Sequence, residues 1–123
     1  MTASNRRISI VEDDVSLRDA MARLIRSLGY RVDIYASAEQ FLDAGPGRGV
    51  DCVVTDIQMP GLSGIELKLR LTALGDLTPV IMVTARSEPE LHERAMASGA
   101  YCLLKKPFTA EALIECLDHA LAA

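Results

Sequence analysis

The feature that most constrains this fold is a fivefold alternation of short apolar runs with longer amphipathic stretches. The apolar runs cover residues 6–11, 31–35, 50–55, 79–83 and 101–104. In the stretches between them, apolar residues recur every three or four positions, which is typical of helices packed on one face. Strands that alternate with helices through short connections form a parallel sheet covered on both faces. The sequence therefore predicts a doubly wound α/β domain, since five units are too few for an eightfold barrel.

Residues suited to capping precede the helical stretches. The candidate caps are Asp14 or Ser16, Ser37, Ser63, Ser87 and Thr109. Ser37 and Ser63 are each followed three positions later by Gln or Glu, which is a capping-box pattern. The fourth stretch, residues 87–98, has the thinnest apolar stripe. We expect this helix to move most easily, because it can bury few contacts.

Composition limits the classes of protein that fit. A chain of 123 residues, half of them hydrophobic, suits one domain with a sizeable core. The net charge of -4 gives no basic footprint for direct nucleic-acid binding. No leader is visible and no apolar run approaches the ~18 residues of a membrane span, which predicts a cytoplasmic protein without membrane contact.

Two further patterns have ordinary explanations. Cys52, Cys102 and Cys116 form no C-x-x-C pair and lie in apolar segments, so we expect small buried residues in a reducing compartment. The glycine-rich segment 45–49 matches no phosphate-binding motif and precedes a strand, which predicts a surface connection.

Polar groups stand where four of the five predicted strands end. They are Glu12, Asp13 and Asp14 after the first strand, Asp56 after the third, Thr84 after the fourth and Lys106 after the fifth. Each alone could be a helix cap or a solvated loop residue. Parallel strands bring their carboxyl ends to one edge of the sheet, where α/β proteins bind ligands. The joint occurrence therefore predicts a functional site.

The residue types at this edge suit phosphoryl transfer. Carboxylates held close together repel, which favours a divalent cation, and oxygen ligands suit Mg²⁺, Mn²⁺ or Ca²⁺ better than zinc. An aspartate can accept a phosphoryl group as an acyl phosphate. Lys106 could supply a positive charge, and the Thr84 hydroxyl could donate to a phosphoryl oxygen. Asp56 is the expected nucleophile.

Four motifs carry a resemblance to a known family. They are Ile-Val-Glu-Asp-Asp at 10–14, Val-Thr-Asp-Ile-Gln-Met-Pro-Gly-Leu-Ser-Gly at 54–64, Val-Thr-Ala at 83–85, and Gly-Ala at 99–100 followed by Lys-Pro-Phe at 106–108. From residue 8 to about 121, the chain closely resembles the receiver domain of two-component response regulators. The segments around Asp56 and at 35–39 are most similar to the FixJ-type transcriptional regulators.

The resemblance implies a CheY-like, flavodoxin-like (βα)₅ fold with strand order 2-1-3-4-5. Residues 1–123 would be a single receiver domain, which either stands alone or is joined to a C-terminal DNA-binding helix-turn-helix output domain. The FixJ-like segments favour the second arrangement. Asp56 would receive a phosphoryl group from a phosphohistidine of a sensor histidine kinase, without acting as a turnover enzyme. Thr84 and Lys106 would contact that group, and a cis peptide bond before Pro107 would place Lys106.

The resemblance also implies a Mg²⁺ site. Glu12 and Asp13 match the acidic pair of the family, with Asp13 the more direct ligand. Asp56 and the backbone carbonyl of Gln58 would complete the protein's share of the ligands. Asp14 is an additional carboxylate and is expected to cap the following helix.

One position departs from the family pattern. Many receivers carry Tyr or Phe three residues before the lysine-proline pair, where it couples to the threonine, but this chain has Leu103. The nearest aromatic residue is Tyr101, so a relay from Thr84 to an aromatic side chain is not implied. Gln58 and Arg86 flank the site and could tune how long the phosphoryl group survives.

We hypothesise that phosphorylation remodels the fourth helix and the fifth strand. The surface with His92, Arg94, Tyr101 and Lys105 would then favour a homodimer or an output partner. The dimer could use the fourth helix and fifth strand, with the fifth helix beside them, or the first helix and fifth strand. As single residues, His92, His119 and Lys105 are expected to be solvated.

Two alternatives stay open from the sequence. A phosphatase of the haloacid dehalogenase class also uses an aspartate after a strand, but it carries a second acid two residues on, where this chain has Gln58. A degenerate receiver would only bind partners, which the joint presence of Asp13, Asp56, Thr84 and Lys106 disfavours. Treatment with a small phosphodonor separates the three functions.

Overall fold

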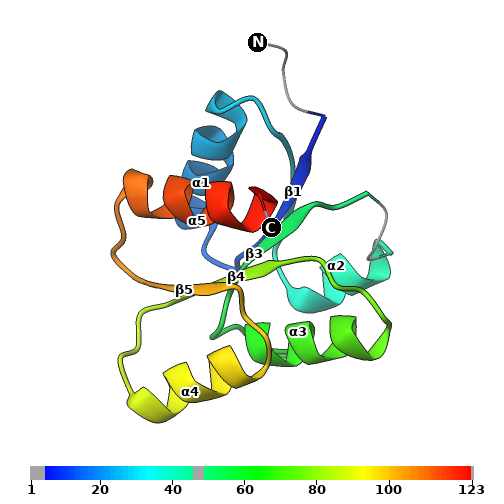
Figure 1. The fold of residues 1–123 in the computed structure, drawn as a ribbon, viewed down its shortest axis with the longest axis vertical. Coiled ribbons are helices and arrows are strands. Elements are labelled where there is room, and N and C mark those ends of the chain that lie inside the picture. The colour runs from blue at the N-terminus through cyan, green and yellow to red at the C-terminus, as the bar shows by residue number, and fades with distance from the viewer. Residues whose placement is uncertain (1–4, 46–48, 123) are drawn as a thin grey trace.

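The computed structural model describes residues 5–45 and 49–122, in which strands and helices alternate as predicted (Figure 1). The strands are β1 (Arg7–Val11), β2 (Arg31–Tyr35), β3 (Cys52–Asp56), β4 (Val80–Thr84) and β5 (Cys102–Lys105). The helices are α1 (Val15–Ser27), α2 (Ala38–Asp43), α3 (Gly64–Ala73), α4 (Pro89–Ala97) and α5 (Ala110–Ala122). The strand bounds differ from the predicted ones by at most two residues.

All strand pairs are parallel, and the sheet order is β2-β1-β3-β4-β5, as the resemblance implied. In the register, Ile10 of β1 lies opposite Ile34 of β2 and Val54 of β3. Helices α1 and α5 cover one face of the sheet, whereas α2, α3 and α4 cover the other (Figure 1). Because β1, β3 and β4 are the inner strands, their carboxyl ends meet at the middle of one edge.

Two apolar clusters fill the spaces between the sheet and its helices. Alternate residues of a strand point to opposite faces, so Ile10 packs with α1 and α5 while Val11 packs with α2, α3 and α4. Every residue of β3 and β4 is buried, as expected for strands covered on both faces. Because both faces of these strands are covered, polar side chains can reach solvent mainly at the ends of the strands.

Most of the predicted caps are confirmed. The Asp14 carboxylate accepts a hydrogen bond from Leu17 N, and the Thr109 hydroxyl accepts one from Ala112 N. Ser63 forms a complete capping box with Glu66 at the start of α3. These side chains satisfy backbone N–H groups that a helix start leaves unpaired.

The predicted cap of α4 is wrong. The helix begins at Pro89, with Glu88 at the N-cap position and no side-chain cap hydrogen bond, so Ser87 lies outside it. The ring of proline fixes φ near the helical value, and proline has no N–H that would be left unpaired at the first position of a helix. Pro89 therefore determines where α4 begins. Ala95 is the buried residue of α4, and Leu91 packs partly against the core. The thin apolar stripe is therefore confirmed.

The cysteines lie in the core as predicted. Cys52 is buried, Cys102 and Cys116 are half-buried, and all three are free thiols. Burial raises the pKa of Cys52 to about 12 and raises the pKa of Cys102 as well. Protonated thiols are poor nucleophiles, so these residues act as small apolar side chains. The reducing compartment stays a prediction.

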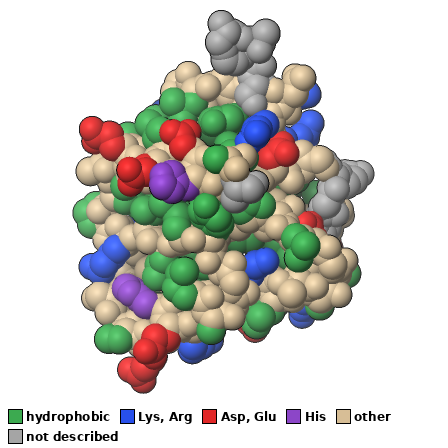
Figure 2. Space-filling view, viewed as in Figure 1, with side chains coloured by type: hydrophobic (Ala, Val, Ile, Leu, Met, Phe, Trp, Pro, Cys, Tyr) green, Lys and Arg blue, Asp and Glu red, His purple; other side chains and the backbone are tan. Residues whose placement is uncertain are grey.

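The surface carries mixed charge. Among the described residues on the face in Figure 2, acidic and basic side chains are interspersed and form no continuous basic area. No helix within 5–45 or 49–122 is long and apolar enough to cross a membrane. Residues 46–48 of the predicted surface connection at 45–49 lie outside the described residues.

Candidate functional site

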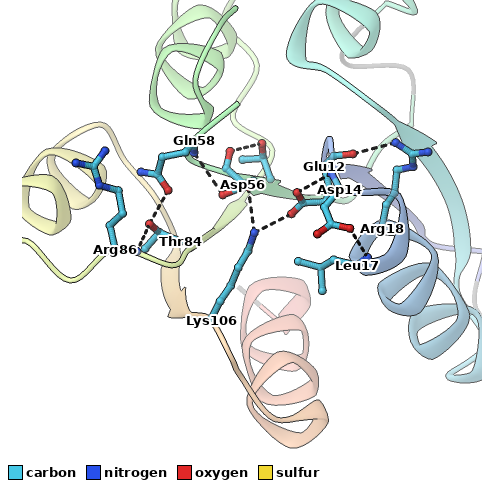
Figure 3. Close-up of polar contacts among 10 residues, drawn as sticks. Glu12, Asp14, Leu17, Arg18, Asp56, Gln58, Thr84, Arg86 and Lys106 are labelled. Atoms are coloured by element: carbon cyan, nitrogen blue, oxygen red, sulfur yellow. Dashed lines mark hydrogen bonds and ion pairs between the residues drawn. The ribbon is translucent and has the colours of Figure 1, made fainter. Parts of the chain in front are cut away.

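The structure brings the predicted site residues together at the carboxyl edge of the sheet (Figure 3). Glu12 and Asp13 follow β1, Asp56 is the last residue of β3, and Thr84 is the last residue of β4. Lys106 directly follows β5 and extends back toward the centre of the edge (Figure 3). Parallel strands thus gather groups that are far apart in sequence.

Lys106 lies between two carboxylates. Its Nζ is 3.0 Å from Asp56 Oδ2 and 3.3 Å from Glu12 Oε1. Burial alone lowers the pKa of Lys106, but the hydrogen bond and charge of Asp56, together with Glu12, outweigh it and raise the pKa. The ammonium group therefore stays charged. The peptide bond between Lys106 and Pro107 is cis, as the resemblance implied.

Glu12 is a fully buried carboxyl group. Its Oε2 accepts a hydrogen bond from Asp14 N at 3.2 Å. Burial raises its pKa to about 7, and the Asp56 charge adds to this, although the Asp14 N–H and Lys106 oppose it. The Lys106 ammonium therefore does not fully offset the cost of burying this carboxylate.

These carboxylates fit a hard divalent cation. Glu12, Asp13 and Asp56 each offer an oxygen, and these atoms lie within 4.8 Å of one another. Across residues 5–45 and 49–122, no other group of three His, Cys, Asp or Glu side chains is close enough to hold a metal. Carboxylate oxygens and a surplus of negative charge suit Mg²⁺. Asp14 points elsewhere, because it caps α1.

The backbone around Asp56 is tightly fixed. Asp56 is 5% exposed, and its Oδ1 accepts a hydrogen bond from Gln58 N at 3.3 Å. The Thr55 hydroxyl donates to the Asp56 backbone carbonyl at 3.0 Å. A Cβ on Gly64 would collide with the same carbonyl oxygen, so this close approach of α3 requires glycine. The nucleophile candidate therefore sits on rigid backbone.

Thr84 is engaged by other groups than Asp56. It is fully buried, and its hydroxyl donates to Gln58 Oε1 at 2.8 Å while accepting from Arg86 N at 3.0 Å. In Figure 3 the side chain of Gln58 extends from the end of β3 toward Thr84. No sequence pattern indicated this side-chain contact.

Two further residues that hold the loops around the site were not predicted from the sequence. Arg18 Nη1 of α1 donates to the Glu12 backbone carbonyl at 3.1 Å, which fixes the loop after β1 (Figure 3). Glu39 of α2 accepts from Leu62 N at 3.0 Å, and this hydrogen bond lowers the pKa of Glu39. Arg18 is only six residues from Glu12, whereas Glu39 and Leu62 are 23 residues apart, and no sequence pattern marks either contact. Only the similarity of residues 35–39 to one subfamily pointed toward Glu39.

Tyr101 does not replace the missing aromatic residue. Its hydroxyl donates to the His119 backbone carbonyl at 3.0 Å, which ties the ring to α5. Leu103 packs against the apolar cluster beneath α2, α3 and α4. The contacts of Thr84 instead lead to Gln58 and Arg86.

The fold and the acidic edge define a class of protein. Residues 8–118 match the model of the response regulator receiver domain. The chain belongs to this family, whose members act as phosphorylation-dependent switches in two-component systems and are signalling proteins, not turnover enzymes. Receiver domains bind Mg²⁺ at an acidic pocket, and this chain has such a cluster.

Similar proteins include two FixJ transcriptional regulatory proteins. The chain is 38% identical to FixJ of Bradyrhizobium diazoefficiens over 93% of its own length and 56% of that protein. It is 39% identical to FixJ of Azorhizobium caulinodans, over 93% of the chain and 54% of that protein. The crystal structure of FixJ-N matches with a TM-score of 0.88 and 32% identity, over 97% of this chain and 95% of the other. The chain thus spans about half the length of these curated relatives.

Replacing Glu12 with Gln should stabilise the metal-free domain more at pH 8 than at pH 5. The folded-state pKa of Glu12 is about 7, above the ordinary 4.5. Its stabilising contribution is therefore complete below pH 4.5 and is lost as the pH rises through 7. One unit of pKa corresponds to about 1.4 kcal/mol. The increase in free energy of unfolding that Glu12→Gln produces should therefore be larger at pH 8 than at pH 5, by on the order of 2 kcal/mol. Denaturant unfolding with a chelator measures it.

Glu115→Gln, on the surface of α5, is the control and should show no such growth. A gain for Glu12→Gln that is the same at both pH values would contradict the prediction.

Proposed function

We propose that this domain accepts a phosphoryl group on Asp56 from the phosphohistidine of a sensor histidine kinase. The observation that supports this most is the position of Lys106 Nζ, 3.0 Å from Asp56 Oδ2 at an edge with three carboxylates. Lys106 and a cation held by Glu12, Asp13, Asp56 and the Gln58 backbone carbonyl would together neutralise the incoming group. Mg²⁺ is the cation we propose, and Mn²⁺ or Ca²⁺ could take its place.

The reaction requires alignment and charge neutralisation more than covalent assistance. An oxygen of Asp56 attacks phosphorus, the bond between phosphorus and the donor imidazole breaks, and an acyl phosphate forms. Bound Mg²⁺ supplies positive charge for the phosphoryl oxygens. Lys106 would contribute its ammonium, which already contacts Asp56, and Thr84 would donate its hydroxyl to a phosphoryl oxygen once it leaves Gln58.

The two alternative functions receive less support. A phosphatase needs a general acid near the nucleophile, and Gln58 occupies the position after Asp56 where that acid would stand. A purely binding receiver would not need Lys106 and the carboxylates assembled around Asp56. Turnover of a phosphomonoester would favour the first alternative, and failure to form an adduct would favour the second.

Acetyl phosphate or phosphoramidate with Mg²⁺ should add a single phosphoryl group to the domain. Intact mass spectrometry measures the adduct, and Asp56→Asn should abolish it because the amide is no nucleophile. Asp118→Asn, an exposed residue of α5, is the matched control and should leave the adduct unchanged. An adduct that persists in Asp56→Asn would place the reactive group elsewhere.

Asp13→Asn should weaken Mg²⁺ binding at least tenfold, because it removes one carboxylate of the cluster. Asp14→Asn is a close control, since Asp14 is the neighbouring residue and Asn can still cap α1. NMR titration with MgCl₂ compares the two variants with the parent. If Asp13→Asn and Asp14→Asn lost the same amount of Mg²⁺ affinity, Asp13 would not be a specific ligand of the metal.

The proposed partners go beyond the domain. We propose a sensor histidine kinase as phosphodonor, a homodimer through α4-β5-α5 or α1-β5, and a DNA-binding output domain joined to residues 1–123 in the whole protein. The similarity to FixJ over about half of that protein's length supports the output domain. This domain itself would contact neither nucleic acid nor membrane, and it would act in the cytoplasm beside its kinase.

Phosphorylation is proposed to act on α4 and β5. Helix α4 buries little and its His92 Nε2 donates to the Arg86 carbonyl at 3.0 Å, next to Thr84. Amide exchange should therefore change across residues 86–104 when beryllofluoride, a phosphoryl mimic, is added with Mg²⁺. Helix α1 should stay unchanged as the internal control. Unaltered exchange across residues 86–104 would rule out this output.

A further inference from the structure

The side chain of Gln58 occupies the hydrogen bond that Thr84 would give to a phosphoryl group. Thr84 has one hydroxyl proton, and it donates that proton to Gln58 Oε1 at 2.8 Å. A hydroxyl has one donor, so Thr84 cannot serve Gln58 and a phosphoryl oxygen together. The hydroxyl is also fully buried, so water does not readily replace either partner.

We propose that the Gln58 amide is a latch that holds Thr84 in the unphosphorylated arrangement and competes with the phosphoryl group for its hydroxyl. The latch rests on the proposed phosphorylation of Asp56. Gln58 is therefore a positioning residue that sets the balance between two states of the domain. This role belongs to its side chain and is separate from the metal ligation proposed for its backbone carbonyl.

The neighbouring contacts show what the latch holds. Thr84 Oγ1 accepts from Arg86 N at 3.0 Å, and the Arg86 carbonyl accepts from His92 Nε2 of α4 at 3.0 Å. Gln58, Thr84, Arg86 and His92 thus form one continuous set of hydrogen bonds from the end of β3 to α4. Figure 3 shows its first part, on the opposite side of Asp56 from Glu12.

The surroundings leave space for the second state. Gln58 lines a cavity of about 450 Å³ that lies between the segment after β3 and α4, together with Met59, Leu91 and Arg94. A released amide can turn into this open space and pair with water. Leu103 stands where many receivers have an aromatic residue, and it packs in the apolar cluster. It has no polar group that could compete with Gln58 for the Thr84 hydroxyl. The latch can therefore take the place of the aromatic relay.

Gln58→Met tests the latch, because Met keeps the length of the side chain and removes the acceptor. The unliganded state then leaves a buried hydroxyl without its acceptor, which is costly, whereas the liganded state loses nothing. Beryllofluoride with Mg²⁺ should therefore bind about tenfold more tightly, measured by NMR titration. The Arg86 amide should also exchange several-fold faster in the unliganded variant. Gln58→Ala should show the same two changes.

A double-mutant cycle with Thr84→Val separates the latch from a direct effect of Gln58 on the bound group. With the hydroxyl gone, Gln58→Met should change beryllofluoride affinity by less than twofold. Persistence of the tenfold gain in that background would overturn the latch. Unchanged or weaker binding by Gln58→Met in the parent would overturn it as well. If the parent binds no beryllofluoride and forms no acyl phosphate, the proposed function itself fails.

Discussion

The site depends on one ammonium group shared by buried carboxylates. Lys106 Nζ contacts both Asp56 and Glu12, while Asp13 lies close enough to join them. Burial raises the pKa of Glu12, and the nearby charge of Asp56 raises it further. A single lysine holds the cluster together without neutralising it. The remaining negative charge suits a divalent cation, which is the basis of the proposed Mg²⁺ site.

The order of the strands determines which groups can reach Asp56. Strand β3 is at the centre of the sheet, so β1 and β4 are its direct neighbours. Glu12 and Asp13 come from the first neighbour, and Thr84 comes from the second. Lys106 starts beyond β4 and reaches Asp56 because a lysine stem is long and its ammonium needs no fixed orientation.

Much of this arrangement could be predicted from residues. Asp56, Thr84 and Lys106 were found because strand periodicity places them at strand ends, and parallel strands share an edge. The strand order came from the family resemblance, since periodicity says nothing about which strands are neighbours. The predicted cap at Ser87 failed because Pro89 fixes the helix start by its backbone angle.

The contacts that were not predicted depend on the conformations of single polar side chains. Gln58 bonds to Thr84 and Arg18 bonds to the Glu12 carbonyl only because folded backbone brings them within reach. Sequence patterns record backbone periodicity well, but they record the direction of a single polar side chain poorly. The contacts that were missed are accordingly the ones that orient the site.

The site divides into two parts that meet at Asp56. The charged part consists of Glu12, Asp13 and Lys106. Burial and Coulomb interactions determine the protonation of its groups and their attraction for a cation. The hydrogen-bonded part contains Thr84 and extends to α4. Its arrangement depends on which individual hydrogen bonds are formed. Gln58 joins the parts, because its backbone N–H donates to Asp56 and its side chain accepts from Thr84. Under the proposed latch, a change confined to its side chain would alter the contacts that lead to α4 and leave those of Glu12, Asp13 and Lys106 in place.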